Sequence, residues 1–225
     1  MSELVIVNGA SNISKRVVQM LTKSKGYNKV RLLDFRPYRQ SVYAFQREML
    51  AQGVTVDKRL TNNAQSLGLA LEGATDVVYF THEYTNLVSC KNNFLIGTAK
   101  LAAQQKIKNV IAVCPVEHDL AYSEDDKNWV QKRQEAEQEA LSANKNLTIL
   151  NTDLVFSEGP SHLLHFAAQS VAKGSIPVSF LGHAAFKPIH SDDLAKAIAH
   201  VQKNGAMHGQ HAIRGTEEHT IAQLV

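Results

Sequence analysis

Short apolar runs rich in β-branched residues alternate along this chain with longer segments in which apolar residues recur at helical spacing. The expected strands cover 4–8, 30–35, 54–56, 76–81, 109–114, 147–151 and 211–214. The expected helices cover about 12–25, 40–52, 62–72, 90–105, 125–144, 161–173 and 191–203. Because right-handed crossovers place helices on both faces of a parallel sheet, this order predicts the doubly wound α/β class.

Length and charge limit the organisation of the chain. Its 225 residues suit one domain, 1–225, and are too few for two full ones. A net charge of +3 without a basic block argues against nucleic-acid binding, and no apolar run approaches membrane-spanning length. The start, MSELVIV, enters the first strand directly, so we expect a cytosolic protein or one whose targeting segment is cleaved, internal or missing here.

The cysteines and histidines do not form a metal-ligand pattern. Cys90 and Cys114 lack CxxC spacing, so we expect neither disulfides nor zinc. Cys114 ends a buried strand with nothing nearby to lower its pKa, which favours an inert thiol. His162 and His165 share a helix face but have no carboxylate or cysteine partner nearby, so no metal site is predicted.

The loop after the first strand reads GASNISKR over residues 9–16. Ligands of doubly wound sheets bind at the carboxyl ends of strands, and a dinucleotide loop there uses three glycines to turn tightly and approach the pyrophosphate. Only Gly9 remains, with Asn12 and Lys15 at the second and third positions. Asn12 tolerates left-handed geometry and a helix N-terminus still attracts phosphate, so we expect weakened binding. A plain turn without ligand stays an alternative.

The second strand ends in Asp34, followed by Arg36 and Arg39. An acidic residue here binds a ribose diol and favours NAD(H), whereas the arginines favour the extra phosphate of NADP(H); two arginines tip the expectation to NADP(H). Thr81 and His82 follow the fourth strand, where a cofactor ribose would pass. The candidate cofactor-binding residues are Gly9, Ser11, Asn12, Ile13, Asp34, Arg36, Arg39, Thr81 and His82.

Four segments resemble the atypical and extended short-chain dehydrogenase/reductase (SDR) superfamily. VNGASNISKRVV resembles its TGATGxxGxxVV loop, and LTNNAQSLGLALEGATDVVYF its DLTDxxSLxxALxGxDxV stretch. KPIHSDDLAKAIAHVQ is similar to its xxIHVDDVAxAIxxAL segment, and HGQHAIRGTEEHTIAQLV to its GxxYxLxGPExLTxxEL ending. The resemblance, closest to the NmrA-like branch and to the NAD(P)-binding accessory subunit of respiratory complex I, implies a Rossmann-type fold. It implies a nucleotide-binding core at about 1–150 and substrate-side elements at about 151–225.

The residues that carry SDR chemistry are replaced in this chain. Family enzymes use a tyrosine whose pKa is lowered by a lysine four residues later, together with a serine after the fifth strand. Aligning RQEAEQEAL with the family's KxxAExxL puts Arg133 at the lysine position and Trp129 at the tyrosine position. Tyr122 has an aspartate four residues later, and residues 113–116 read VCPV where the serine would stand. Arg59 replaces the aspartate that contacts adenine in the family.

These departures predict a catalytically degenerate SDR-like protein that serves as a non-enzymatic accessory subunit, with NADP(H) held structurally. The resemblance makes respiratory complex I, on the mitochondrial matrix side, the candidate assembly, with other protein subunits as partners. Two alternatives remain: an active NAD(P)-dependent reductase or epimerase with unorthodox residues, and an NmrA-like NADP(H) redox sensor.

Near the C-terminus, Ser191 followed by Asp192 and Asp193 predicts a capped helix start.

Overall fold

The computed structural model describes residues 2–9, 12–23, 26–33, 40–57, 64–81, 88–115, 124–157, 172–173, 185–220 and 223. The strands are β1 (Glu3–Val7), β2 (Lys29–Leu33), β3 (Thr55–Asp57), β4 (Asp76–Phe80), β5 (Asn109–Pro115), β6 (Leu147–Thr152), β7 (Val155–Phe156), β8 (Ala185–Phe186), β9 (Ile189–His190), β10 (Gly209–Ile213) and β11 (His219–Thr220). The helices are α1 (Asn12–Lys23), α2 (Gln40–Ala51), α3 (Ala64–Leu71), α4 (Val88–Gln104), α5 (Glu124–Ala143) and α7 (Ser191–Asn204).

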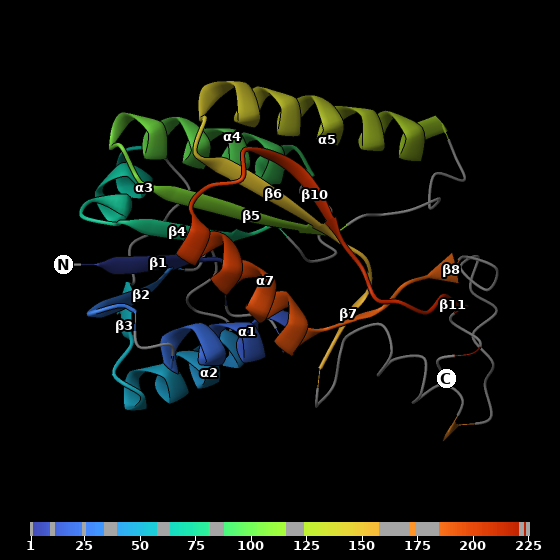
Figure 1. Cartoon of the computed structure of the whole chain (residues 1–225), viewed down its shortest axis with the longest axis horizontal. Helices are drawn as coiled ribbons and strands as arrows, with labels where there is room; N and C mark the ends of the chain where they lie inside the picture. Colours follow the sequence, from blue (N-terminus) through green and yellow to red (C-terminus); the bar gives the residue numbers. More distant parts are fainter. Residues whose placement is uncertain are drawn as a thin grey trace.

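A seven-stranded sheet forms the centre of the structure, in the order β10-β6-β5-β4-β1-β2-β3. Every neighbouring pair of these strands is parallel. Helices α3, α4 and α5 cover one face, and α1, α2 and α7 cover the other (Figure 1). The predicted doubly wound α/β class is therefore confirmed.

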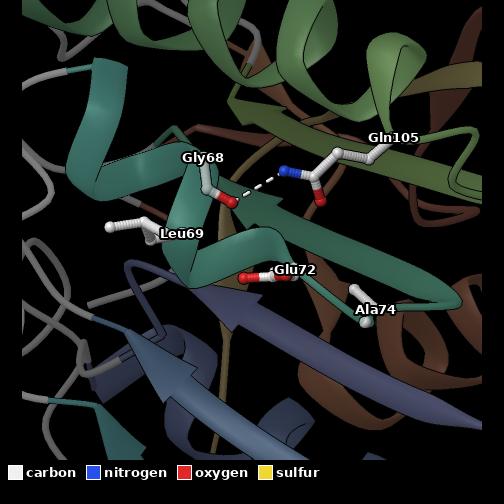
Figure 2. A pocket seen from close by; sticks show the side chains of 6 residues that line it. Gly68, Leu69, Glu72, Ala74 and Gln105 are labelled. Carbon is white, nitrogen blue, oxygen red and sulfur yellow. Dashed lines mark hydrogen bonds between the residues drawn. The ribbon is translucent and has the colours of Figure 1, made fainter.

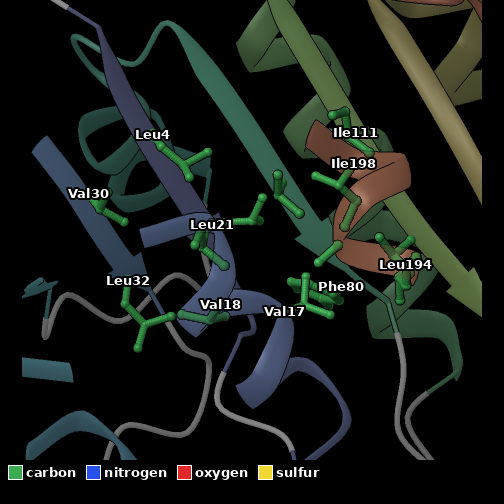
Figure 3. Packing of buried hydrophobic residues seen from close by; sticks show 14 of the residues in the cluster. Leu4, Val17, Val18, Leu21, Val30, Leu32, Phe80, Ile111, Leu194 and Ile198 are labelled. Atoms are coloured by element: carbon green, nitrogen blue, oxygen red, sulfur yellow. The ribbon is translucent and has the colours of Figure 1, made fainter. Parts of the chain in front are cut away.

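The strands are buried on both faces because their apolar residues run without interruption. In β1, Leu4 and Ile6 join the core under α1, α2 and α7, while Val5 and Val7 join the core under the opposite helices. Figure 3 shows the first of these cores, with side chains of α1 and α7 packed on β1, β2, β4 and β5. Each fully buried aliphatic side chain contributes about 1.5–3 kcal/mol, so both helical layers are held by the sheet.

Polar side chains join the strands at the amino edge of the sheet. Arg31 forms an ion pair with Glu3 of β1, and its Nη2 donates to the carbonyl of Glu72, just past the end of α3, at 2.6 Å. Asn109 Nδ2 donates to Asp76 Oδ1 at 2.5 Å, linking β5 to β4. The guanidinium thus satisfies a carbonyl at a helix C-terminus, where positive charge is favoured.

The expected elements of the sheet and its covering helices agree with the observed ones to within two or three residues in the described ranges. The expected helix at 161–173 lies almost entirely outside the described residues. Two small sheets, β7 with β9 and β8 with β11, were not expected, because two-residue strands leave no periodic signal. None of the helices in the described ranges combines the length and apolar character needed to cross a lipid bilayer.

Candidate functional site

The strand order reverses at β1, which pairs with β2 on one side and β4 on the other. In doubly wound sheets a crevice opens at this reversal, outside the carboxyl ends of the strands. Asn8 occupies the end of β1 with φ of 58°. Its backbone N–H donates to the carbonyl of Leu33 at 2.8 Å, and its Nδ2 donates to the carbonyl of Phe80 at 2.9 Å. One residue therefore ties the ends of β1, β2 and β4 at the mouth of the crevice.

Gly9 is required by packing, whether or not a ligand binds. A Cβ atom on Gly9 would lie 2.7 Å from Ile6 Cγ2, 2.9 Å from Leu32 Cδ1 and 3.1 Å from Val18 Cγ2. These side chains come from β1, β2 and α1, so the missing Cβ lets the helix pack close against two strands. Gly9, which the sequence predicts to let a pyrophosphate approach the backbone, is therefore also required for the packing of α1 on the sheet.

Helix α1 begins at Asn12, three residues after Gly9, and its first turn contains no acidic residue. Free N–H groups of a helix N-terminus attract phosphate, and no carboxylate in this turn opposes it. Asn12 and Ile13 form part of this turn, while Ser11 lies outside the described residues. Further along α1, Lys15 pairs with Glu48 of α2 at 2.7 Å and Arg16 with Asp192 of α7 at 2.8 Å. Both cations bind the helix to its neighbours.

Thr81 is the described residue on the ribose side of the crevice. Its N–H and its Oγ1 both lie 3.0 Å from the carbonyl of Val113, to which each donates. The hydroxyl donor is therefore used to join the ends of β4 and β5, and only its lone pairs remain for a ligand. Asp34, Arg36, Arg39 and His82 lie outside the described residues, so their role in cofactor binding stays a prediction.

Arg133, which the sequence alignment puts at the position of the family's lysine, is part of a buried network. Its Nε donates to Glu137 Oε1 at 2.9 Å, and the side chains of Arg133 and Glu137 are 16% and 5% exposed. Gln210 Nε2 of β10 donates to the other carboxylate oxygen at 3.1 Å. The carboxylate of Glu137 is thus bonded by α5 and by the edge strand together. Trp129 lies in α5 one turn before Arg133, and indole has no acidic hydroxyl to donate.

Cys114 lies on the same face of the sheet as this network, fully buried in β5. Burial raises the pKa of its thiol to about 12, although Arg133 and Thr81 favour the thiolate and oppose that rise. A thiol with this pKa is protonated at neutral pH and is a poor nucleophile. The expectation of an inert Cys114 is therefore supported by its burial.

The start of α7 lies close to the carboxyl end of β6. His190 is its N-cap, with Nδ1 accepting from the N–H of Asp192 at 3.2 Å. The expectation of capping at Ser191 was wrong, because Ser191 is the first helical residue, with its side chain fully buried. The imidazole of His190 also contacts Phe156 edge to face, with ring centroids 5.2 Å apart. Sequence reasoning missed this pair, since only β7–β9 pairing brings the two residues together.

A surface groove of about 570 Å³ lies away from this site, at the amino end of β4. Figure 2 shows it between the last turn of α3 and the end of α4, where Gln105 Nε2 donates to the carbonyl of Gly68 at 2.7 Å. Exposed Leu69 and Glu72 form part of its lining. Because doubly wound sheets bind ligands at the opposite edge, the groove is not the nucleotide site.

Within the described ranges, no three potential metal ligands of the His, Cys, Asp or Glu type come together.

Comparison with known proteins identifies the fold but no sequence relative. No protein-family model matches the chain, and no curated protein matches it. The dTDP-glucose 4,6-dehydratase of Bacillus anthracis, solved with NAD, superposes with a TM-score of 0.77 at 16% identity, over 99% of this chain and 78% of that one. The Citrobacter triphenylmethane reductase with NADP(H) gives 0.73 at 14% identity, over 100% and 73%. The NADPH-dependent quinone oxidoreductase of Escherichia coli with NADPH gives 0.73 at 18% identity, over 98% and 72%.

The fold is the Rossmann-type α/β fold of these NAD- and NADP(H)-bound structures. At these identities the likeness concerns the fold alone, and it confirms the Rossmann-type architecture inferred from the sequence, while the SDR assignment stays a prediction. The closer likeness to a complex I accessory subunit stays a prediction.

The resemblance to SDR enzymes implies a dinucleotide, and the described residues at the phosphate end and at the catalytic end of such a site fit it differently. At the phosphate end, Asn8 is hydrogen-bonded to the end of β4, and the missing side chain of Gly9 lets α1 pack close to β1 and β2. The first turn of α1 contains no acidic residue. This end fits a pyrophosphate. At the other end, Arg133, which the sequence alignment puts at the position of the catalytic lysine, is paired with the buried Glu137.

Proposed function

We propose that this protein binds NAD(P)(H) in the crevice between β1 and β4 and does not use the SDR tyrosine–lysine mechanism. The observation that supports binding is the intact geometry of the phosphate end, where Asn8 and Gly9 position the start of α1. The neighbours solved with NAD, NADP(H) and NADPH share this fold. We propose NADP(H) as the preferred form, with Arg36 and Arg39 as ligands of the ribose phosphate.

A bound nicotinamide supplies a hydride, and the protein must supply or accept the matching proton. Arg133 stays charged across the accessible pH range, so it neither donates a proton nor accepts one. Its pairing with Glu137 at 2.9 Å also neutralises much of the positive charge that would lower the pKa of a neighbouring acid. Trp129, one turn away, has no titratable group, so these residues of α5 do not reproduce the tyrosine–lysine pair.

From this we propose a non-enzymatic role as an accessory subunit of a larger assembly, in which the nucleotide stabilises the fold. A ligand that binds only the folded state adds stability that grows with its concentration over Kd. Respiratory complex I is the assembly that the sequence resemblance suggests, with the mitochondrial matrix side as the location and its other subunits as partners. This assignment is tested by co-purification from native extracts, where a lone monomer would contradict it.

A second candidate function is supported by the comparisons. The triphenylmethane reductase and the quinone oxidoreductase bind NADP(H) or NADPH and have this fold, so we also propose an NAD(P)H-dependent reductase that uses residues other than a tyrosine–lysine pair. Such an enzyme would consume NADPH steadily with a quinone or an aromatic dye as acceptor. Loss of turnover on changing Tyr122 would support it, whereas Cys114→Ser should leave turnover unchanged because the thiol is protonated.

The experiment that tests nucleotide binding is mass spectrometry of any nucleotide released from the denatured native protein, followed by titration of NADP⁺ and NAD⁺. Asn12→Asp is the informative variant, because an acid at the first position of α1 suits the helix dipole but repels a phosphate. We expect binding to weaken about tenfold or more with the melting temperature unchanged or higher. Asn28→Asp is the matched control, since it makes the same change on an exposed turn before β2, at the amino edge. Equal loss in both variants, or no binding in the wild type, would refute the proposal.

A further inference from the structure

Two rings form a corner beyond the carboxyl end of β6. Phe156 ends β7, His190 ends β9, and the parallel pairing of the two strands sets these residues side by side. Their ring planes meet at 72°, with centroids 5.2 Å apart. Phe156 is 37% exposed and the side chain of His190 is 31% exposed. Single exposed aromatic residues are common on protein surfaces, so Phe156 alone indicates no site, and the imidazole of His190 adds a hydrogen-bonding group beside it.

The start of α7 fixes the proton of His190. Nδ1 accepts the N–H of Asp192 at 3.2 Å, so in the neutral imidazole the proton is on Nε2. The first turn that holds the ring is itself anchored, because Arg16 of α1 donates to both carboxylate oxygens of Asp192, at 2.8 and 3.3 Å. The cap therefore leaves Nε2–H as the donor of a partly exposed ring, which lies in contact with the exposed ring of Phe156.

Charge around the corner selects the kind of ligand. The carboxylate of Asp192 lies 3.9 Å from His190 Nδ1 and is itself paired with Arg16 at 2.8 Å, so the corner carries little net charge and suits an uncharged ligand. A neutral N–H donor beside an aromatic ring suits a neutral acceptor on a flat apolar molecule. We infer that Phe156 and His190 bind a planar conjugated ring that carries a carbonyl oxygen, with the ring packed on Phe156 and the oxygen accepting from His190 Nε2. A quinone is the simplest compound of this class.

The test uses 2,3-dimethyl-1,4-naphthoquinone, whose methyl groups block addition of thiols, and isothermal titration with the full chain without nucleotide. Phe156→Ala should weaken binding about two- to tenfold, the range of one aromatic contact. His190→Asn should weaken it about two- to tenfold by removing one hydrogen bond. Asparagine is a strong N-cap, so this variant keeps the start of α7. Met207→Ala, which removes another exposed apolar side chain, should bind as the wild type does.

An oxygen-free analogue isolates the role of His190. Binding of 2,3-dimethylnaphthalene should fall in Phe156→Ala and stay unchanged in His190→Asn, because it offers no acceptor. Equal quinone affinity in the wild type, Phe156→Ala and His190→Asn, or the absence of saturable binding, would overturn the inference. So would an equal effect of His190→Asn on both ligands. Since no nucleotide is present, failure here leaves nucleotide binding untouched.

Discussion

Replacing Gly9 with alanine separates the two roles that a glycine at the end of β1 can have. If Gly9 serves only a phosphate, alanine should weaken nucleotide binding and leave the free energy of unfolding of the nucleotide-free protein unchanged. If it serves packing, alanine should destabilise the protein with or without nucleotide. The contacts of the added Cβ atom favour the second outcome.

The magnitude follows from three distances. Carbon atoms in contact ordinarily lie about 3.5–4.0 Å apart. The added atom would fall short of about 3.5 Å by about 0.8 Å to Ile6, 0.6 Å to Leu32 and 0.4 Å to Val18. Two of these neighbours are β-branched and stiff at χ1, so they move only with their strand or helix. Overpacking of this kind costs about 1–3 kcal/mol, and we expect the free energy of unfolding to fall by about 2 kcal/mol.

Urea unfolding followed by circular dichroism, without nucleotide, measures this loss. For a chain of this length, about 2 kcal/mol corresponds to a fall in Tm of roughly 4–8 °C. Gly97→Ala is the matched control, because Gly97 lies within α4 and an added Cβ would have no neighbour within 4 Å. That variant should gain up to about 1 kcal/mol from helix propensity. If Gly9→Ala were as stable as the wild type, the packing explanation would be refuted and the phosphate role would be favoured.

Three further outcomes are expected. Gly215→Ala should destabilise the protein more than Gly9→Ala, because the added Cβ would overlap the backbone carbonyl of Pro188, and a backbone group cannot move aside by changing rotamer. Chemical unfolding measures the loss. A smaller loss of stability than in Gly9→Ala would contradict this expectation. Arg31→Met should cost about 1–3 kcal/mol, because it removes the donor to the carbonyl of Glu72 and leaves the carboxylate of Glu3 paired with Lys29 alone, at 3.6 Å. Adding Glu3→Leu should restore part of that stability in a double-mutant cycle. Cys114 has a pKa raised from its ordinary 9.0 to about 12, so its neutral form is favoured in the folded state. Its contribution to stability is complete below about pH 9 and is lost as the pH rises towards 12. Mass spectrometry should find Cys114 unmodified by iodoacetamide at pH 8 in the native protein, and rapid modification there would contradict its burial.

The sheet was predictable because parallel strands covered on both faces leave continuous apolar runs. Asp76–Phe80 and Asn109–Pro115 could be located from such runs, and the helices between them from their spacing. The SDR resemblance added the order of the elements. Binding residues after the second strand could be named from the same logic, but they fall outside the described residues and stay predictions.

The contacts that shape the site were not predictable, since they join residues far apart in the chain. Asn8 bonds the carbonyl of Phe80, and Glu137 bonds Gln210, through hydrogen bonds that depend on strand register. Composition gave no sign that Asn8 would adopt a positive φ, although asparagine is among the residues that tolerate it. The cap at His190 was missed because serine is the commoner cap and stands next to it.

Helix α7 has a consequence for the order in which the chain folds during synthesis. Its Leu194 and Ile198 complete the core over β4, β5 and β6, where Ile111 and Leu150 belong to the same cluster. The ribosome produces all three strands long before it reaches Ser191–Asn204. Until that segment emerges, one face of these strands is exposed to water, and such surfaces favour aggregation. A nascent chain that lacks α7 therefore leaves this apolar face uncovered, and the emergence of α7 buries it.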